Sequence, residues 1–495
     1  MRMTRRGGPL RRLLFWLAVL VVLVAVGGAA IAATLYARAD TSNVGKLEFA
    51  NELSIPPLLE PRIDRAGRKI FELELQAGTS DLLPGTQTET WGANDVHLGP
   101  TLRVRHGDSL RMEVENQLPE TTTVHWHGMH LPADADGGPH QTISPGETWT
   151  PEWTVDQPAA TLWYHPHMLG VTEDHVYRGI AGLIIVDDPE AVALPLPKRY
   201  GVDDFPLIIQ DKRLDDDGSL DFSKGMISPT GRLGDTILVN GTFDPSLRVT
   251  RERIRLRLLN ASNARVYNVG FSDDRPFQLI GTDGGLLGTP ERTTRVQLSP
   301  GERAEALVQV RPGERVVLRS FEPDLGTNFW DGRFAGGDDT FDLVELRAAA
   351  RLEAAPEVPE RLVRVEELRA PRATRTFELS GQSSINGREM EMQRIDIVAS
   401  PGAVEHWEVR NASGTPHNFH PHGVHFRVVD YAGHAPPAAL AGWKDTVYVP
   451  PNESVRFLVR LPEYSDRETP YMFHCHVLQH EDRGMMGQLV VAEGQ

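Results

Sequence analysis

Cysteine is almost absent from this sequence: Cys475 is the only one among 495 residues, so no disulfide can form within the chain. Many exported proteins are stabilised by several cysteine pairs, and a framework of that kind is excluded here. A lone thiol that persists in an oxidising compartment is best explained by a metal ion that binds it. Cys475 is therefore the first residue to examine for function.

Positive charge is also scarce. The chain has 51 lysines and arginines against 68 aspartates and glutamates, and its formal net charge is −17 at pH 7. Residues 1–39 hold six arginines and no acidic residue, so the remainder carries −23. A surface this acidic repels nucleic acid and anionic lipid, and we expect no nucleic-acid partner. The acidity is also what keeps an exported protein soluble.

The sequence has one long uncharged apolar run, from Leu13 to about Ala33, and it is long enough to cross a bilayer. Five arginines precede it, at positions 2, 5, 6, 11 and 12. Ala37-Arg38-Ala39 fits a signal-peptidase site. Residues 1–39 are thus either a signal peptide or an uncleaved membrane anchor. In both cases the rest is exported: periplasmic, extracellular or membrane-anchored facing outward, with membrane contact only through this segment.

A repeat organises the remainder of the chain. Strand-like stretches end at Asn116, Asn260 and Asn411, which lie 144 and 151 residues apart. A second marker follows each asparagine: Ser144-Pro-Gly-Glu147, Ser299-Pro-Gly-Glu302 and Pro450-Pro-Asn-Glu453. Alternating apolar residues between glycine and proline turns indicate antiparallel strands. The repeat predicts an all-β chain of three Greek-key sandwich or barrel domains.

We place the three domains at residues 46–190, 200–348 and 372–495. Linkers are expected from Asp187 to Arg199 and from Ala348 to Pro371, the second partly helical. The middle domain has Tyr267 and Asn268 where its siblings have histidines, so we expect it to bind no metal.

The chemistry concentrates in residues 474–486, His-Cys-His-Val-Leu-Gln-His-Glu-Asp-Arg-Gly-Met-Met. Two histidines, one cysteine and a weak axial methionine are the ligands of a copper electron-transfer site. If the strand before it continues through His476, then Cys475 faces one way while His474 and His476 face the other. One tripeptide would then contact two metal centres.

Histidine pairs elsewhere supply further ligands. The first domain contains His125-Trp-His127-Gly and His165-Pro-His167, and the third contains His417, His420 and His422. In an extended segment the two histidines of a His-x-His motif share one face, which suits metal binding. The other eight histidines, at positions 97, 106, 130, 140, 175, 406, 425 and 434, are expected to be surface or structural residues; His130 and His140 are the weakest of these assignments.

Together these four motifs resemble those of the multicopper oxidases, which include the laccases, and the likeness covers nearly the whole chain after residue 45. It is strongest to the bacterial laccase and cuprous-oxidase branch, through His480-Glu-Asp-Arg-Gly-Met-Met486 and Gly442-Trp-Lys-Asp-Thr446. The resemblance implies three cupredoxin-like domains and four copper ions, one of type 1, one of type 2 and two of type 3.

The resemblance also implies the ligands of each copper. His417, Cys475 and His480 would bind the type 1 copper, with Met485 axial. The type 2 copper would take His125 and His420. The type 3 pair would take His127, His165, His167, His422, His474 and His476. The trinuclear cluster would therefore lie between the first and third domains.

Oxygen reduction consumes protons, so carboxylates are needed near the metals. Asp136 matches the family's acid, although an Asp/Gly-rich loop also favours a simple turn residue there. Glu481 matches a second relay carboxylate. His480 is expected to offer the donor an exposed imidazole edge, and Asp445 to brace the type 1 loops.

The predicted function is laccase-like: one-electron oxidation of phenols or aromatic amines, coupled to four-electron reduction of O2 to water, by a monomer. The alternative is oxidation of Cu(I) or another metal ion. Against it, residues 320–401 contain only Met390 and Met392, and Ser413-Gly-Thr-Pro416 precedes His417 instead of an acidic/Met pair. A non-enzymatic envelope scaffold, an electron carrier and a nitrite reductase are more remote alternatives.

Overall fold

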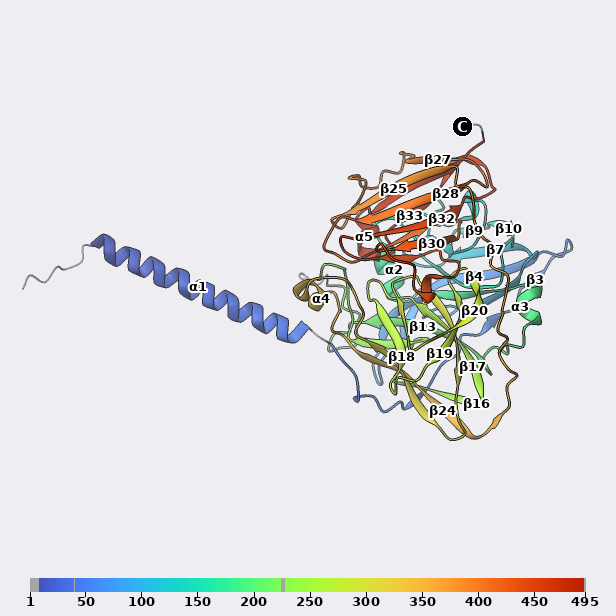
Figure 1. Cartoon of the computed structure of the whole chain (residues 1–495), viewed down its shortest axis with the longest axis horizontal. Coiled ribbons are helices and arrows are strands. Elements are labelled where there is room, and N and C mark those ends of the chain that lie inside the picture. The colour runs from blue at the N-terminus through green and yellow to red at the C-terminus, as the bar shows by residue number, and fades with distance from the viewer. Residues whose placement is uncertain (1–8, 40, 224–227, 494–495) are drawn as a thin grey trace, which may run out of the picture.

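The computed structural model describes residues 9–39, 41–223 and 228–493. Arg2, Arg5 and Arg6, which belong to the predicted export signal, lie outside these residues. Helix α1 (Pro9–Ala39) projects from the body as a long rod (Figure 1). It is long and apolar enough to cross a membrane, and none of its residues is buried. A signal sequence has the same properties, so both alternatives for this segment stand.

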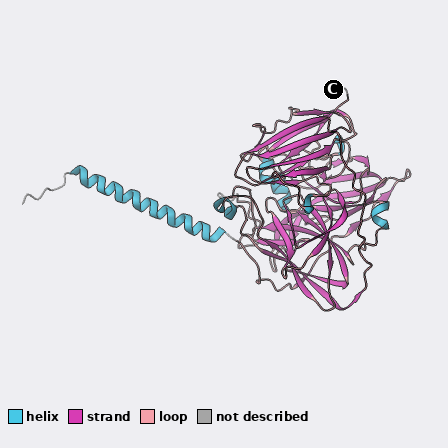
Figure 2. Cartoon of the chain, in the orientation of Figure 1, coloured by secondary structure: helices cyan, strands magenta, loops and turns pink. Residues whose placement is uncertain are grey.

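Strands are the main regular element of the body (Figure 2), and the predicted all-β class with a preceding apolar helix is confirmed. Within the described residues the strands form three pairs of sheets, which follow one another along the chain. We refer to them as the first, middle and third sheet pairs. Each pair encloses a separate apolar core. The domain boundaries at residues 46, 190, 200, 348 and 372 stay predictions.

The first sheet pair packs a sheet built on β10-β7-β4-β3, with β5 and β9 at its side, against the sheet β2-β6-β12-β11-β8. Its strands are β2 (Leu58–Leu59), β3 (Arg62–Ile63), β4 (Lys69–Ser80), β5 (Thr88–Ala93), β6 (Thr101–Arg105), β7 (Ser109–Asn116), β8 (His125–His127), β9 (Thr148–Trp149), β10 (Glu152–Thr154), β11 (Ala160–His165) and β12 (Gly182–Asp187).

The middle sheet pair consists of the sheets β1-β16-β24-β23-β18-β21 and β15-β14-β13-β17-β22-β19-β20. Its strands are β1 (Asn51–Glu52), β13 (Asp204–Lys212), β14 (Thr236–Val239), β15 (Thr242–Phe243), β16 (Pro245–Arg251), β17 (Arg253–Asn260), β18 (Tyr267–Phe271), β19 (Phe277–Thr282), β20 (Gly285–Thr293), β21 (Arg295–Leu298), β22 (Arg303–Gln309), β23 (Arg315–Phe321) and β24 (Phe341–Glu353). Strand β1 joins this pair by lying parallel to β16.

The third sheet pair consists of β26-β25-β28-β32-β30 and β27-β34-β33-β29-β31, coloured orange to red in Figure 1. Its strands are β25 (Ala373–Ser380), β26 (Ser384–Ile385), β27 (Ile397–Ala399), β28 (Val404–Asn411), β29 (His417–Pro421), β30 (Phe426–Tyr431), β31 (Val447–Val449), β32 (Ser454–Arg460), β33 (Asp466–His474) and β34 (Met486–Val491).

Short helices occupy some connections: α2 (Thr172–Arg178), α3 (Pro189–Ala193), α4 (Phe329–Phe334) and α5 (Leu478–Asp482), with 3-10 turns at Ala133–Ala135 and Ala438–Leu440. The expectation of partial helix between Ala348 and Pro371 is wrong. Strand β24 runs on to Glu353, and the residues from there to Pro371 carry no helix. Prolines at 356, 359 and 371 lack the N–H that a helix needs, which outweighs the alanines and glutamates there.

The repeated asparagine performs the same structural task in all three sheet pairs. The side-chain Nδ2 of Asn116 donates to the carbonyls of Glu120 and Ile143, and its Oδ1 accepts from the backbone N–H of Leu118. Asn260 and Asn411 make the equivalent three hydrogen bonds. Each buried asparagine thereby links the end of its strand to the residue just before the second repeat marker, which is Ile143, Leu298 or Val449. This explains why the repeat is visible in the sequence.

A buried ionic network joins the middle sheet pair to the first. Arg257 on β17 makes a two-pronged bond to Asp204, with N–O distances of 2.7 and 2.9 Å, and a third bond of 3.0 Å to Glu305. Its Nη1 also donates to Thr161 on β11, at 2.7 Å. Arg257 and both carboxylates are buried. Removing the arginine would leave the buried Asp204 without its ion-pair partner, while Glu305 would keep its pair with Arg255.

We expect Arg257→Ala to lower the free energy of unfolding by about 3–5 kcal/mol, because Asp204 would stay buried without its ion-pair partner and Glu305 would keep only Arg255. Chemical denaturation followed by circular dichroism measures the effect. Arg369→Ala is the matched control, since Arg369 pairs with Glu367 where both side chains are exposed. A pair of that kind should contribute nothing measurable. Equal midpoints for the two variants would contradict the prediction.

Candidate metal centre

Adjacent strands bring the histidines of each sheet pair together. In the first sheet pair, β8 and β11 are antiparallel with His125 opposite His165, and His167 follows two residues later. In the third sheet pair, β29 and β33 place His420 opposite His474. Both sets are fully or almost fully buried where the first and third sheet pairs meet. The structure thus brings together the eight histidines that the sequence assigned to a trinuclear cluster.

The ring nitrogens form two sets of three. Nε2 of His474 lies 3.1 Å from Nε2 of His167 and 3.1 Å from Nε2 of His422. In the second set, Nε2 of His165 lies 3.4 Å from Nδ1 of His127 and 3.4 Å from Nε2 of His476. Each set therefore combines residues from the first and third sheet pairs.

His125 and His420 complete the arrangement. Their ring centroids are 5.8 Å apart, and the Nε2 atom of each is buried without a hydrogen-bond partner. Nδ1 of His125 lies 2.9 Å from the carbonyl oxygen of Asp136, and Nδ1 of His420 lies 2.8 Å from that of Asp445. An Nδ1–H that donates to a carbonyl leaves a free lone pair on Nε2. These rings are therefore oriented as metal ligands.

The spacing and protonation of the rings fit metal ions. Imidazole nitrogens bound to one metal at about 2.0–2.1 Å lie about 3.3 Å apart at tetrahedral angles, close to the distances found here. Burial lowers the pKa of seven of these histidines, to about 4 for His167 and about 3 for His476. Those seven rings are therefore neutral near pH 7, as metal binding requires.

Cys475 belongs to a separate cluster. Its Sγ lies 3.5 Å from Nδ1 of His417 and 3.7 Å from Nδ1 of His480, and the two nitrogens are 3.1 Å apart. A sulfur and a nitrogen on one tetrahedral metal would be about 3.5 Å apart. Burial raises the pKa of Cys475 to about 12, so a thiolate needs a cation beside it. Met485, the predicted axial ligand, is fully buried in the same core.

The local backbone differs from the prediction in one respect. Strand β33 ends at His474 and does not continue to His476, because a turn leads directly into α5. The side chains nevertheless diverge as alternation suggests, with Cys475 against His417 and its two neighbours against the other histidine sets.

His480 is not exposed, and the expectation of an exposed imidazole edge is wrong. The residue is fully buried, and its Nε2 lies 3.1 Å from the carbonyl oxygen of Pro229, which covers it. His417 is buried too, and its Nε2 lies 3.2 Å from Oγ of Ser413. Pro229 and Ser413 are both half-buried, so each ring is one residue away from solvent.

The two predicted carboxylates, Asp136 and Glu481, both contact Nδ1 atoms of the clustered histidines. Oδ2 of Asp136 lies 2.7 Å from Nδ1 of His422. Burial raises the pKa of Asp136 well above its usual range. Glu481 lies 3.4 Å from Nδ1 of His167 and 3.2 Å from Nδ1 of His474. Burial would raise the pKa of Glu481, but the two histidines outweigh it and hold that pKa below its usual range.

Asp445 does not brace the Cys475 cluster as expected. Its Oδ1 lies 3.0 Å from Nε2 of His127, and its carboxylate accepts two hydrogen bonds from Arg303 at 2.7 and 2.5 Å. It therefore orients the histidines shared between the first and third sheet pairs. The expected role was wrong because the partners of Asp445, His127 and Arg303, are distant from it in sequence. Only the folded chain brings them together.

The sequence did not reveal the contribution of the middle sheet pair. Gly301, in the turn before β22, adopts a positive φ of 86°, and a Cβ there would lie 3.2–3.3 Å from the rings of His127 and His476. Arg303, two residues later, holds Asp445. The only signal was the Ser299-Pro-Gly-Glu302 repeat, which placed this turn in line with its counterparts.

Asn418 is a second residue that the sequence analysis missed. Its Oδ1 accepts the backbone N–H of His476 at 2.6 Å and lies 3.6 Å from Sγ of Cys475. Its Nδ2 donates to the carbonyl of Pro300 at 2.8 Å. It thus connects the Cys475 cluster, the shared histidines and the middle sheet pair. Its position next to His417 was the available signal.

Known proteins identify the family. Two family models, both described as multicopper oxidase, match residues 74–191 and residues 358–495. The chain belongs to the multicopper oxidase family. Membership implies copper as the cofactor, and multicopper oxidases use O2 and a reducing substrate.

The relatives of this multicopper oxidase include proteins named for cell division and proteins named as oxidases. The cell division protein FtsP of Xenorhabdus nematophila is 38% identical over 461 residues, which cover 90% of this chain and 95% of that protein. The multicopper oxidase mco of Staphylococcus aureus is 34% identical over 457 residues, covering 91% and 95%.

Solved structures confirm the cupredoxin-like fold. A laccase from Pediococcus acidilactici superposes with a TM-score of 0.81 at 35% identity, covering 90% of this chain and 94% of that one. A Campylobacter jejuni multicopper oxidase described as a metallo-oxidase superposes with a TM-score of 0.79 at 28% identity, covering 92% and 98%.

We expect Glu481→Gln to weaken copper binding 10–100-fold, because the carboxylate that orients His167 and His474 loses its charge. Retention of copper against a competing chelator measures the effect. Glu391→Gln is the control, since the Glu391 side chain is 74% exposed and pairs only with Arg394 among the described residues. Unchanged retention in Glu481→Gln would contradict the role given to this residue.

Proposed function

We propose that this multicopper oxidase is a laccase-type enzyme, which removes single electrons from phenols or aromatic amines and reduces O2 to water. The observation that carries the proposal is the presence of two separate donor clusters joined by three consecutive residues. Cys475 belongs to one cluster, while His474 and His476 belong to the other. A scaffold or a simple electron carrier would have no use for the second cluster.

The residues fit four copper ions. His417, Cys475, His480 and Met485 would hold the type 1 copper, and His125 and His420 the type 2 copper. His127, His165 and His476 would hold one type 3 copper, and His167, His422 and His474 the other. When bound, the coppers supply one-electron oxidation of the donor and four-electron reduction of dioxygen.

The chain itself orients the ligands and handles protons. Oδ1 of Asp136 is buried without a hydrogen-bond partner, and its raised pKa favours the protonated carboxyl, so Asp136 can hold a proton beside His125 and His422. Glu481 contacts two other rings of the cluster, His167 and His474. Reduction of O2 consumes four protons, and two carboxyls in contact with the histidine cluster suit their delivery.

We further propose three cupredoxin domains within a monomer that works outside the cytoplasm. The shared histidines come from residues on both sides of the middle sheet pair, so one chain completes the site. Helix α1 either directs export or remains as an anchor. Its end packs on the body, with the Tyr36 ring stacked on Trp330 and the Tyr36 carbonyl 2.8 Å from Nε of Arg333.

The donor class follows from the surroundings of the Cys475 cluster. Ser413 is the residue that covers His417, and neither a methionine nor an acid occupies that place. A soft Cu(I) ion prefers thioether ligands, which favours an organic donor here. The relatives include both a protein described as a laccase and one described as a metallo-oxidase, so family membership does not decide between the two.

A role in cell division is the second candidate, and it rests on the FtsP relatives. In that case the chain would act through its surface at the cell envelope. The complete set of buried donors argues for the enzyme, because burying this many neutral imidazoles without a metal would destabilise the protein.

Turnover should be faster on a phenol than on Cu(I) when O2 consumption is measured with the copper-loaded protein. The reason is that the side chain in contact with Nε2 of His417 is a serine hydroxyl, which is a poor ligand for a soft Cu(I) ion. The comparison is made with and without added copper, because extra metal could activate a metal-ion oxidase. Activity on Cu(I) alone would overturn the preference for organic donors.

Cys475→Ser should abolish both the blue colour and O2 consumption, while the unfolding midpoint of the copper-free protein changes little. Serine nearly preserves the volume of the side chain but supplies no thiolate. In a division-defective strain that depends on this chain, a scaffold would work equally well with serine. Retained oxidase activity in the variant would disprove the assignment of Cys475.

A further inference from the structure

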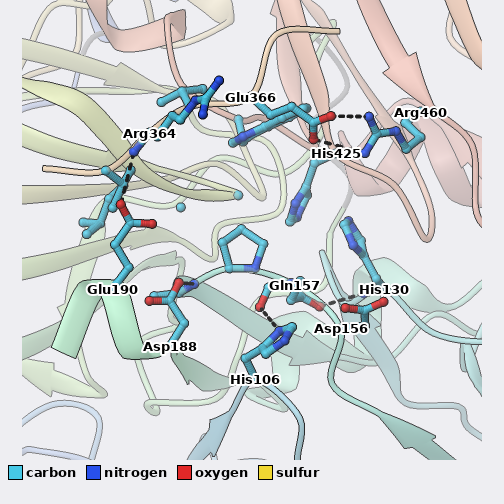
Figure 3. A pocket seen from close by; sticks show the side chains of 18 of the residues that line it. His106, His130, Asp156, Gln157, Asp188, Glu190, Arg364, Glu366, His425 and Arg460 are labelled. Atoms are coloured by element: carbon cyan, nitrogen blue, oxygen red, sulfur yellow. Dashed lines mark hydrogen bonds and ion pairs between the residues drawn. The ribbon is translucent and has the colours of Figure 1, made fainter. Parts of the chain in front are cut away.

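A large cavity opens where the three sheet pairs meet, and two histidines outside the multicopper centre point into it (Figure 3). Its volume is about 910 Å³. His130 comes from the loop after β8 and His425 from the residue before β30. Their ring centroids are 4.4 Å apart. From the sequence alone, both were expected to be surface or structural residues.

Neither Nε2 atom has a hydrogen-bond partner, and both are buried. Each ring also has a backbone hydrogen bond, to Asp156 for His130 and to Gly128 for His425. Since Nε2 is free in both rings, these bonds fall to Nδ1–H, which leaves the lone pair on Nε2. Burial lowers the pKa of His130 to about 3 and also lowers that of His425, so both rings are neutral.

Two buried acceptors without donors are costly, and a cation satisfies both at once. The ring separation of 4.4 Å is slightly shorter than the 4.7 Å of His167 and His474 and the 4.8 Å of His417 and His480, which are pairs proposed to share one copper. The same backbone-bound Nδ1 orients His125 and His420. In spacing and tautomer, the pair at the cavity resembles the metal ligands and not ordinary core histidines.

The cavity itself favours cations. Its lining contains five carboxylates, Asp156, Asp188, Glu190, Glu366 and Glu463, against the two guanidinium groups of Arg364 and Arg460. One of those guanidinium groups is already paired, since Arg460 binds Glu366. The surplus negative charge draws positive ions inward. Oδ2 of Asp445 also lies 3.7 Å from Nε2 of His425, although Arg303 already pairs with that carboxylate.

We propose that His130 and His425 bind a borderline transition-metal cation through their Nε2 atoms, at a site separate from the multicopper centre. Imidazole pairs suit Zn²⁺, Cu²⁺ and Ni²⁺, whereas Ca²⁺ and Mg²⁺ prefer oxygen ligands. Water from the cavity completes the coordination. With two protein ligands the ion is held weakly and exchanges with solvent. Asp445 also contacts His127, so the ion lies one carboxylate away from the shared histidines.

Zinc is the probe, because it is redox-silent and leaves the colour of the copper sites readable. The full-length protein is loaded with copper, cleared of weakly held metal by gel filtration in a mild chelator, and dialysed against Zn²⁺. The wild type should take up one zinc ion per chain. His130→Gln and His425→Gln should each weaken this uptake at least tenfold, with the blue colour and the unfolding midpoint retained.

His106→Gln is the matched control, since His106 lines the same cavity but is exposed and should bind zinc as the wild type does. Zinc-soaked crystals provide a second measurement that needs no variant: anomalous density should lie about 2.0–2.1 Å from both Nε2 atoms. Absence of a zinc equivalent in the wild type, uptake unchanged in both variants, or density elsewhere would each overturn the proposal. None of these readouts depends on oxidase turnover.

Discussion

The candidate metal centre depends on the hydrogen bonds made by Nδ1, the ring nitrogen that faces away from the centre in several of its histidines. Nδ1 of His125, His165 and His420 each meets a backbone carbonyl, at 2.8–2.9 Å. Those bonds fix the tautomer and turn Nε2 toward the centre, and burial keeps the rings neutral. The backbone carbonyls therefore determine how the ligands are oriented. Without them the same side chains could rotate or present the wrong nitrogen.

Three carboxylates extend this arrangement across the sheet pairs, and each crosses an interface. Asp136 of the first sheet pair contacts His422 of the third, and Glu481 of the third contacts His167 of the first. Asp445 of the third contacts His127 of the first and Arg303 of the middle. The contacts that orient the ligands therefore also hold the sheet pairs together. Copper binding and the stability of the interfaces are coupled for this reason.

The sequence pointed to the histidines and the cysteine of the two clusters because their spacing is a local feature. His-x-His on a strand and Cys475 between two histidines are recognisable from spacing alone. The repeated asparagines were recognisable for the same reason: each satisfies its hydrogen bonds within its own sheet pair, so each repeat keeps the same local pattern.

What the sequence could not reveal depends on contacts between distant segments. The covering of His480 by Pro229 joins residues 251 positions apart, and the pairing of Asp445 with Arg303 joins residues 142 apart. No periodicity records such contacts. The proximity of His130 and His425 was hidden for the same reason, since each is an isolated histidine until the fold places the rings together.

The cover over the Cys475 cluster has a further consequence for the donor. Nε2 of His417 contacts Ser413 and Nε2 of His480 contacts Pro229, and both of these neighbours are half-buried. A donor would therefore meet Ser413 or Pro229 at the surface and would not touch the imidazole itself. Electron transfer across one hydrogen bond needs no bond between donor and metal, so the surface does not have to fit one molecule closely. If the proposed laccase-type function holds, a covered site of this kind would select donors by how readily they lose an electron more than by their shape. A metal-ion oxidase would instead need ligands that bind its single ion before oxidising it.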